Sequence, residues 1–492
     1  MNTQIRRLGV AMVVLFVVLF ASVNRIQVFS AQPISNNPAN ARLIVESFKI
    51  DRGDILGADG RTVLAKSVHT DGKLEFLRRY PQGELYSHVT GYFSLKCGLD
   101  QIESSYNDYL DAKSNDLLGS TFNDLILGRP KRGASIVTTI DPKLQQVAFQ
   151  ALAQAAPHGG AVVAMNPSTG AVEAFVSIPQ YDPNELSQRN LDAQGAACNQ
   201  LHEDPGNPLL SNASDELYPP GSTFKLVDMA AALENGMTLN TKFPNPKELD
   251  LPQTDLTLEN FGGEHCAGGA DQITLEEAFI ESCNVTFAEL GLDLGPEVLS
   301  EQTKKFGFDS HVPFDVPFNE GHFPEPSEFE DREPAVAFSA IGQFDVKANP
   351  LQLALISSAI ANGGTQMRPR LVGEIRDPNG SVLRTFGPEV YSNPMSASTA
   401  ADITQAMVGV VQEGTGTAAQ IPGVTVAGKT GTAQTSSGAP HAWFTCFAPA
   451  ENPQIAVAVV VLNGGNLANE ATGGQVAAPV AKAIVEAALG RG

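Results

Sequence analysis

The sequence is poor in positive charge. Its 32 lysine and arginine residues are outnumbered by 54 aspartate and glutamate residues, and the formal net charge is −22 at pH 7. This balance argues against binding to nucleic acid and against electrostatic adhesion to anionic lipid. The sequence also lacks low-complexity tracts and repeats of about 20–50 residues, which excludes solenoid folds. Its 492 residues suffice for about two or three globular domains.

Cysteine is scarce. The five residues are Cys97, Cys198, Cys266, Cys283 and Cys446. No Cys-x-x-Cys pair is present, and His265 with Cys266 supplies too few ligands, so the sequence predicts no zinc site. In an exported protein, an odd number of cysteines leaves at least one thiol unpaired. Cys266 with Cys283 is the pair that we expect if a disulfide forms.

One long apolar run stands near the N-terminus. Leu8–Val23 follows Arg6 and Arg7, and it is slightly short of the roughly 20 residues of a spanning helix unless residues 26–31 are included. The alternative is a cleaved signal peptide, but "FASVN" makes a poor cleavage site. The arginines favour a cytoplasmic N-terminus. We therefore expect an uncleaved signal anchor in residues 1–31, which places the rest of the chain outside the cytoplasm.

The patterns that follow the expected anchor divide into two parts. Residues 32–150 alternate short strands with turns and include one helical pattern at 98–112, which predicts a β-rich pedestal module. Residues 151–492 begin and end with apolar strands that enclose several helical patterns. This arrangement predicts an α+β domain in which helices cover an antiparallel sheet.

A serine and a lysine open an apolar helical pattern in the second part. Ser222 and Lys225 stand three residues apart, and the pattern ends at Asn235-Gly236. Residues at this spacing share a helix face, so the hydroxyl and the amine can meet. Burial lowers the pKa of a lysine towards that of a useful base, and serine needs such a base to act as a nucleophile. About one S-x-x-K is expected by chance, so this pair alone does not separate accident from catalysis.

A second short motif lies further along. Ser282-Cys283-Asn284 forms an S-x-N inside a helical pattern. The motif is weak by itself, because Ser35-x-Asn37 and Ser105-x-Asn107 match it equally well. Those two precede Ser222, whereas Ser282 follows it.

The third motif is stronger. Lys429, Thr430, Gly431 and Thr432 interrupt an apolar strand with one amine and two hydroxyls. Gly431 would let a substrate backbone lie close against the strand. Lys429 and the two hydroxyls can hold a carboxylate.

In this order, S-x-x-K, S-x-N and K-T-G resemble the penicillin-interacting serine enzymes. The surrounding segments "YPPGSTFK", "AIGQ", "GTGTAAQ" and "HAWFTCFAP" resemble the transpeptidase domain of penicillin-binding proteins. Upstream, "DRGDILGADGRTVLA" and "GLDQIE" are similar to the N-terminal module of class B members, and the whole chain is most similar to the actinobacterial PBPA type. Cys283 departs from the pattern, since β-lactamase relatives often have Asp in the middle of S-x-N.

The resemblance implies a membrane-anchored D,D-transpeptidase that cross-links peptidoglycan stem peptides and is acylated by β-lactams. It implies that Ser222 attacks a D-Ala-D-Ala end, that Lys225 takes its proton, and that Ser282 with Lys429 protonates the leaving amine. Asn284, Thr430, Gly431 and Thr432 would bind substrate, and the backbone N–H groups of Ser222 and Thr432 would form the oxyanion hole. No cofactor or metal is implied.

The resemblance also implies partners, namely a membrane glycosyltransferase and proteins of cell division or elongation. Three alternatives stay open: a D,D-carboxypeptidase, a serine β-lactamase, or a catalytically silent scaffold or β-lactam sensor. A β-lactamase needs a base for deacylation, and we interpret the E-x-x-x-N from Glu389 to Asn393 as accidental. A silent scaffold has no need of all three motifs.

Overall fold

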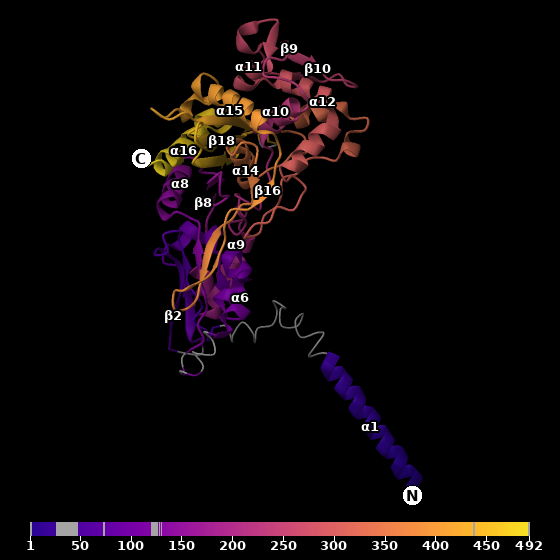
Figure 1. The fold of residues 1–492 in the computed structure, drawn as a ribbon, viewed down its shortest axis with the longest axis vertical. Coiled ribbons are helices and arrows are strands. Elements are labelled where there is room, and N and C mark those ends of the chain that lie inside the picture. Colours follow the sequence, from indigo (N-terminus) through magenta and orange to yellow (C-terminus); the bar gives the residue numbers. More distant parts are fainter. Residues whose placement is uncertain are drawn as a thin grey trace.

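The computed structural model describes residues 2–25, 48–71, 74–119, 126, 128, 130–435 and 438–490. Figure 1 shows a long molecule with helix α1 at one end, a lower part built mainly from the first third of the chain, and a larger upper part. The C-terminal helix lies in the upper part, beside the sheet.

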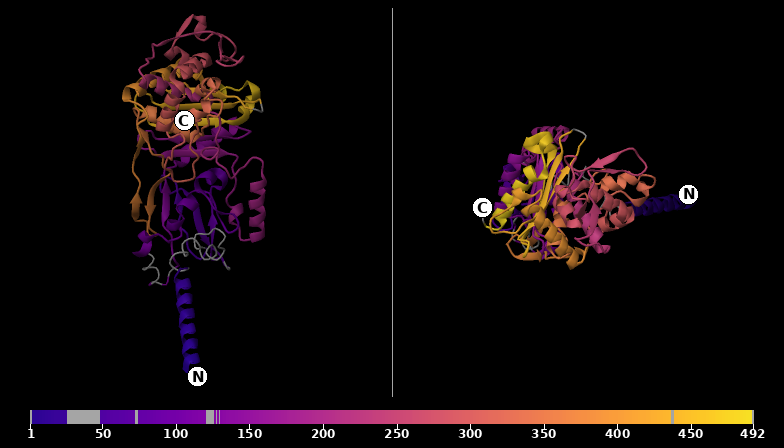
Figure 2. Two further views of the ribbon diagram at one scale, coloured as in Figure 1. Left: turned by 90° about the vertical axis from the view of Figure 1, so that its right-hand side faces the viewer. Right: turned by 90° about the horizontal axis from the view of Figure 1, so that it is seen from above.

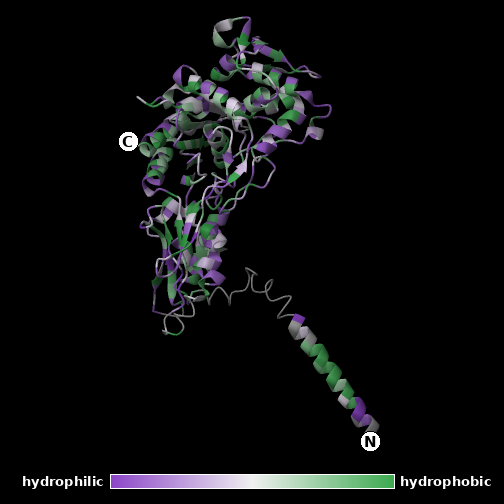
Figure 3. Cartoon of the chain, viewed as in Figure 1, coloured by the Kyte–Doolittle hydropathy of each residue, from purple (hydrophilic) through white to green (hydrophobic). Residues whose placement is uncertain are grey.

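Helix α1 (Asn2–Asn24) contains the apolar run near the N-terminus. Its large apolar side chains from Leu8 to Phe20 are 53–70% exposed, and they form the green stretch of this helix in Figure 3. Among the described residues, no helix combines the length and the apolarity that crossing a membrane requires. The signal anchor therefore stays a prediction, and residues 26–31 of it lie outside the described residues.

The lower part is built on a mixed six-stranded sheet with the order β15-β14-β6-β1-β2-β3. Its strands are β1 (Ile55–Leu56), β2 (Val63–His69), β3 (Phe76–Arg79), β6 (Ser135–Thr138), β14 (Val372–Arg376) and β15 (Val382–Thr385). The hairpin β14–β15 comes from the stretch that the sequence assigned to the second domain, and Figure 1 shows it as an orange arm beside the indigo and purple strands. The lower part is thus built from two separate stretches of chain, and a boundary near residue 150 stays a prediction.

Short elements complete the lower part. They are α4 (Ser87–Thr90), β4 (Phe93–Ser94), β5 (Gly98–Leu99), α5 (Gln101–Ser105) and α6 (Asn107–Leu110). The single helix expected at 98–112 is therefore two short helices that meet at Tyr106. Glu103 is fully buried and accepts hydrogen bonds from Arg52 (2.6 Å) and Arg78 (2.5 Å). A buried carboxylate needs such partners, so Arg52 has a structural role in this cluster.

The upper part contains a five-stranded antiparallel sheet with the order β17-β18-β19-β7-β8. Its strands are β7 (Gly160–Met165), β8 (Val172–Ile178), β17 (Ala427–Ala433), β18 (His441–Ala448) and β19 (Ile455–Val461). Every residue of β19 is buried, because helices cover both faces of the sheet. The sequence prediction of an antiparallel sheet covered by helices is confirmed.

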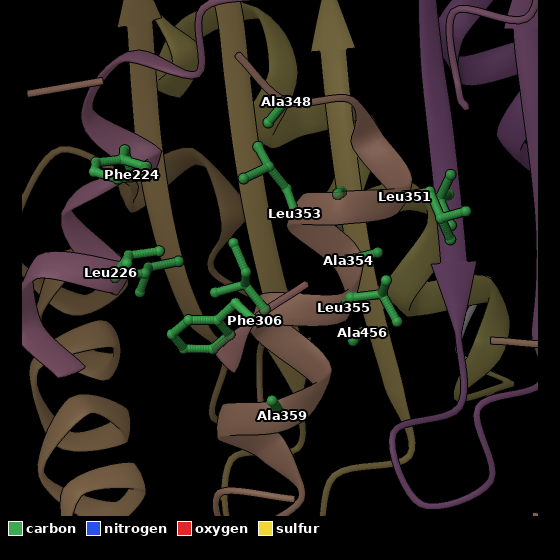
Figure 4. Close-up of a cluster of buried hydrophobic side chains, with 14 of the residues drawn as sticks. Phe224, Leu226, Phe306, Ala348, Leu351, Leu353, Ala354, Leu355, Ala359 and Ala456 are labelled. Atoms are coloured by element: carbon green, nitrogen blue, oxygen red, sulfur yellow. The ribbon is translucent and has the colours of Figure 1, made fainter. Parts of the chain in front are cut away.

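Helices α8 (Pro142–Ala155) and α16 (Gly473–Ala488) pack together on one face of this sheet, as the view from above in Figure 2 shows. Asp141 caps α8 with its side chain, and Pro142 takes the first helical position. On the other face, α14 (Pro350–Ala361) packs on β7, β18 and β19. Figure 4 shows its Leu351, Leu353 and Leu355 in the apolar layer that separates the sheet from the helices beyond.

The remaining elements surround this core. They are α9 (Leu191–Glu203), α10 (Lys225–Glu234), β9 (Lys242–Pro244), β10 (Glu248–Asp250), β11 (Thr257–Glu259), β12 (Gln272–Thr274), α11 (Leu275–Ile280), α12 (Asn284–Lys305), α13 (Glu333–Ala340), β13 (Gln366–Met367), β16 (Val390–Ser392) and α15 (Ala397–Gln412). Strands β9 to β12 form two small antiparallel sheets, β10–β11 and β9–β12, at the top of Figure 1.

Two disulfides join distant segments. The expected pair, Cys266 with Cys283, is confirmed. A second disulfide, which the sequence did not predict, joins Cys97 of the lower part to Cys198 of α9. Cys446 is the free, buried cysteine.

Candidate active site

Ser222 lies in a single 3-10 turn, Gly221–Thr223, directly ahead of α10. The turn is held from two sides. Gly221 has a positive φ of 53°, its N–H donates to the Gly342 carbonyl over 3.0 Å, and a Cβ on it would lie 2.8 Å from the Thr432 carbonyl oxygen. Only glycine fits this place, so the residue before the serine positions Ser222 beside strand β17. The Ser222 side chain stays partly exposed.

Lys225 begins α10 and is fully buried. Its Nζ donates to the Ser282 carbonyl over 2.8 Å and to Asn284 Oδ1 over 3.0 Å. Burial holds the pKa of Lys225 well below its ordinary value; the charge of Lys429 lowers this pKa further, whereas Asp228 raises it. A neutral amine, the form that can accept a proton, is therefore favoured at this position.

Ser282 stands in the short connection between α11 and α12, where its φ is 62°. A left-handed conformation is unfavourable for a non-glycine residue, which marks this serine as held in place by its surroundings. The neighbouring Cys283 is the N-cap of α12 and is bonded to Cys266. The disulfide thus ties the S-x-N segment to the connection between β11 and β12, strands of the two small sheets.

Lys429 lies on β17, the edge strand of the five-stranded sheet. Its Nζ donates to Ser282 Oγ over 2.8 Å and to the Thr430 carbonyl over 3.2 Å, and lies 5.3 Å from the centroid of the Phe279 ring. Burial lowers the pKa of Lys429 to about 7. The contact with Ser282 brings the second and third sequence motifs together.

The two threonines of the third motif have different partners. Thr432 Oγ1 accepts a hydrogen bond from the Gly473 N–H over 3.3 Å, at the start of α16. Thr430 Oγ1 shares a hydrogen bond of 2.6 Å with Thr415 Oγ1.

The structure gives a different reason for a glycine at position 431 than the expected approach of a substrate backbone. A Cβ there would lie 2.8 Å from the Pro220 carbonyl oxygen and 2.9 Å from Thr223 Cγ2. The space beside Gly431 is therefore filled by the turn that carries Ser222. This glycine lets the strand and the turn approach each other.

Sequence reasoning missed two residues near these motifs. Asp228 is fully buried three residues after Lys225, and neither of its carboxyl oxygens has a hydrogen-bond partner. Its signal was a charged residue inside an apolar helix. Thr415 belongs to the segment "GTGTAAQ", but its contact with Thr430 depends on the fold. Trp443 is fully buried and donates to the Pro219 carbonyl, so it is a packing residue behind the turn of Ser222.

Other features of the described residues lie away from the motifs. A cavity of about 500 Å³ is lined by Lys96 and by α9 residues around Cys198, and no motif residue lines it. The group with metal-like spacing consists of Cys97, Cys198 and His202, but its two cysteines form a disulfide and supply no thiolate. Glu389, the first residue of the E-x-x-x-N pattern, forms an ion pair with Arg368.

Comparisons with known proteins agree with this geometry. The penicillin binding protein transpeptidase domain matches residues 160–486, and the penicillin binding protein A dimerisation domain matches residues 52–136. The chain is 40% identical to the peptidoglycan D,D-transpeptidase PbpA of Mycolicibacterium smegmatis over 100% of both chains. It is 39% identical to the protein of the same name from Mycobacterium tuberculosis H37Rv over 99% of both.

Solved structures are similar as well. Penicillin-binding protein A from M. tuberculosis, as a ceftriaxone acyl-enzyme complex, gives a TM-score of 0.85 at 39% identity and covers 90% of this chain and 100% of that chain. Its penicillin G acyl-enzyme complex gives 0.83 at 40% identity over 89% and 99%. The resemblance drawn from the motifs is confirmed, and the chain belongs to the penicillin-binding protein transpeptidase family.

Proposed function

We propose that this chain is a peptidoglycan D,D-transpeptidase that forms its acyl-enzyme on Ser222 and is acylated there by β-lactams. The observation that carries the proposal is the hydrogen-bonded set of Lys225, Ser282 and Lys429, together with a partly exposed Ser222 in the turn directly ahead of Lys225. Full-length relatives carry this activity in their names. Acyl-enzyme complexes of a similar structure support acylation by β-lactams.

Lys225 is the base in the first step. Its neutral amine takes the proton from Ser222 Oγ while that oxygen bonds to the carbonyl carbon of the penultimate D-Ala. Backbone N–H groups of Ser222 and Thr432 stabilise the oxyanion, and losing one such donor costs about 3 kcal/mol. No metal or organic cofactor takes part in this assignment.

Ser282 and Lys429 serve the leaving group. Because Ser282 Oγ accepts from Lys429, its own O–H is available to donate to the amine of the terminal D-Ala as the C–N bond breaks. Lys429 then returns a proton to Ser282. An amine of a second stem peptide then attacks the acyl carbonyl carbon and loses a proton to Lys429 by way of Ser282. The cross-link forms as the C–O bond to Ser222 breaks, and Lys225 returns its proton to Ser222 Oγ.

Substrate binding falls to the remaining motif residues. Thr430 and Thr432, with the charge of Lys429, hold the terminal carboxylate. Asn284 binds the substrate amide, and its Oδ1 also holds the Lys225 ammonium or amine. Gly431 keeps the strand close to the nucleophile.

The proposed location outside the cytoplasm rests on the N-terminal helix. We propose that α1 anchors the chain in the cell membrane with its N-terminus in the cytoplasm. The exposed apolar side chains of α1 support this, since no other part of the described chain covers them. The lower part, built on the six-stranded sheet that includes the hairpin β14–β15, would then lift the catalytic part away from the membrane. A membrane glycosyltransferase and proteins of division or elongation would be its partners there.

The test is the intact mass of the protein after incubation with penicillin G, for the wild type and for Ser222→Ala. A long-lived adduct on the wild type alone is the expected result. An adduct that disappears as penicillin is consumed would indicate a β-lactamase, and no adduct on either protein would indicate a silent scaffold. Incubation with a D-Ala-D-Ala stem peptide, with and without an amine acceptor, then separates transpeptidation from carboxypeptidation by the mass of the product.

A further inference from the structure

Thr415 lies in the loop that follows α15, and its side chain is exposed. Its hydroxyl lies 2.6 Å from the hydroxyl of Thr430 on β17. Thr430 itself is only 6% exposed. The exposed member of this hydroxyl pair is therefore the loop residue, not the motif residue.

Close packing fixes the loop in this position. A Cβ on Gly474, the second residue of α16, would lie 2.2 Å from the Thr415 carbonyl oxygen and 3.6 Å from Thr430 Cγ2. A Cβ on Gly414 would lie 2.5 Å from the carbonyl oxygen of Ile280, at the end of α11. Glycines on two sides thus allow the loop to sit between α16 and α11, and the Thr415 hydroxyl has a defined place.

The donors around the proposed carboxylate position can be counted. An ionised carboxylate only accepts hydrogen bonds, so every partner must donate. Lys429 is fully buried and directs Nζ to Ser282 and to a main-chain carbonyl. Thr432 is partly exposed and accepts from the Gly473 N–H, which leaves its own O–H free to donate.

The Thr430–Thr415 pair supplies one further free proton, because only one of the two hydroxyls can donate to the other. If the buried Thr430 donates to Thr415, the exposed Thr415 keeps an O–H that can reach a ligand. In the reverse order, the free proton would belong to the buried hydroxyl. Exposure therefore favours the arrangement in which Thr415 donates outward.

We infer that Thr415 is a further substrate-binding residue, whose hydroxyl donates to the terminal carboxylate of the stem peptide and to the carboxylate of β-lactams. This inference rests on the proposed function. It makes the loop after α15 part of the recognition of a free carboxyl end, together with Thr430 and Thr432.

The test compares acylation of the full-length protein by penicillin G and by its methyl ester, which lacks the charged carboxylate. Thr415→Val removes the hydroxyl at constant shape, and Thr415→Ser keeps it. Thr417→Val, at an exposed position in the same loop, is the matched control. The second-order rate constant is measured for each protein with each compound.

We expect Thr415→Val to slow acylation by penicillin G about tenfold or more, the size typical of a lost hydrogen bond to a charged group. Acylation by the methyl ester should stay within about twofold of the wild type. Thr415→Ser and Thr417→Val should match the wild type with both compounds.

Equal losses with acid and ester would show that Thr415 acts through the loop structure, and no loss with penicillin G would show that it binds no carboxylate; either result overturns the inference. Both leave the proposed function standing, because the wild type still forms its adduct on Ser222. Failure of the wild type to form any adduct would instead overturn the proposed function.

Discussion

Lys429 Nζ donates a hydrogen bond of 2.8 Å to Ser282 Oγ, across 147 positions of the chain. The contact joins an edge strand to the connection between two helices. Because Ser282 Oγ accepts this hydrogen bond, its own proton is available for another acceptor.

Two substitutions of Ser282 distinguish the role of its hydroxyl from the strain of its backbone. Ser282→Gly and Ser282→Ala both remove the proton donor, so each should slow acylation by penicillin about a hundredfold or more. Glycine alone relieves the left-handed conformation at φ 62°, so we expect the glycine variant to be more stable than the alanine variant by about 1 kcal/mol. Urea denaturation and acylation rates check the two effects. Equal stability of the variants would contradict the strain, and full activity of either would contradict the role in proton transfer.

The burial of Lys429 predicts a pH dependence of stability. Its pKa is lowered to about 7 in the folded protein, whereas a lysine in the unfolded chain titrates near ~10.4. Between these values the unfolded chain binds one proton more, so this residue makes the free energy of unfolding rise with pH by about 1.4 kcal/mol per pH unit. Lys429→Met should remove this contribution. Urea denaturation at about pH 7.5 and about pH 8.5 measures it, and equal slopes in both proteins would contradict the prediction.

A substitution of Gly342 tests how closely the Gly221–Thr223 turn is packed. The φ of Gly342 is 70°, and a Cβ would lie 2.1 Å from the Gly221 carbonyl oxygen. Gly342→Ala should therefore displace the turn and slow acylation about a hundredfold, since displacements near 1 Å have effects of this size. Gly363 is the control, because its φ is 61° and nothing lies within 4 Å of its missing Cβ. Gly363→Ala should cost about 1 kcal/mol of stability and leave acylation unchanged; similar rates for both variants would refute the crowding.

The two disulfides should differ in their effect on catalysis. Cys266 and Cys283 are 17 residues apart, so replacing both with alanine should cost about 3 kcal/mol of stability. Acylation should slow as well, because Cys283 stands between Ser282 and Asn284. Replacing Cys97 and Cys198, which are 101 residues apart, should cost about 4.7 kcal/mol by the same loop entropy but leave acylation of the folded protein unchanged. Loss of acylation in the second variant alone would contradict this assignment.

The sequence was a good guide where local pattern decides structure. The strands of the upper sheet, the cap of α8 at Asp141 and the end of α10 at Asn235-Gly236 all follow from residue spacing and capping preferences. The order of the three motifs was sufficient to identify the family. The prediction of one helix at 98–112 was wrong, because the chain forms two short helices there, separated by Tyr106.

The relationships that combine distant segments could not be predicted from the sequence. The tertiary structure placed β14 and β15 in the lower sheet, paired Cys97 with Cys198, and filled the space beside Gly431 with the turn of Ser222. It also gave Thr430 a partner in Thr415. Helical and strand periods are local properties of a chain, so they can be read from residue spacing. Which hydroxyl meets which amine depends on how whole elements pack, and packing is settled by contacts among residues that the sequence keeps far apart.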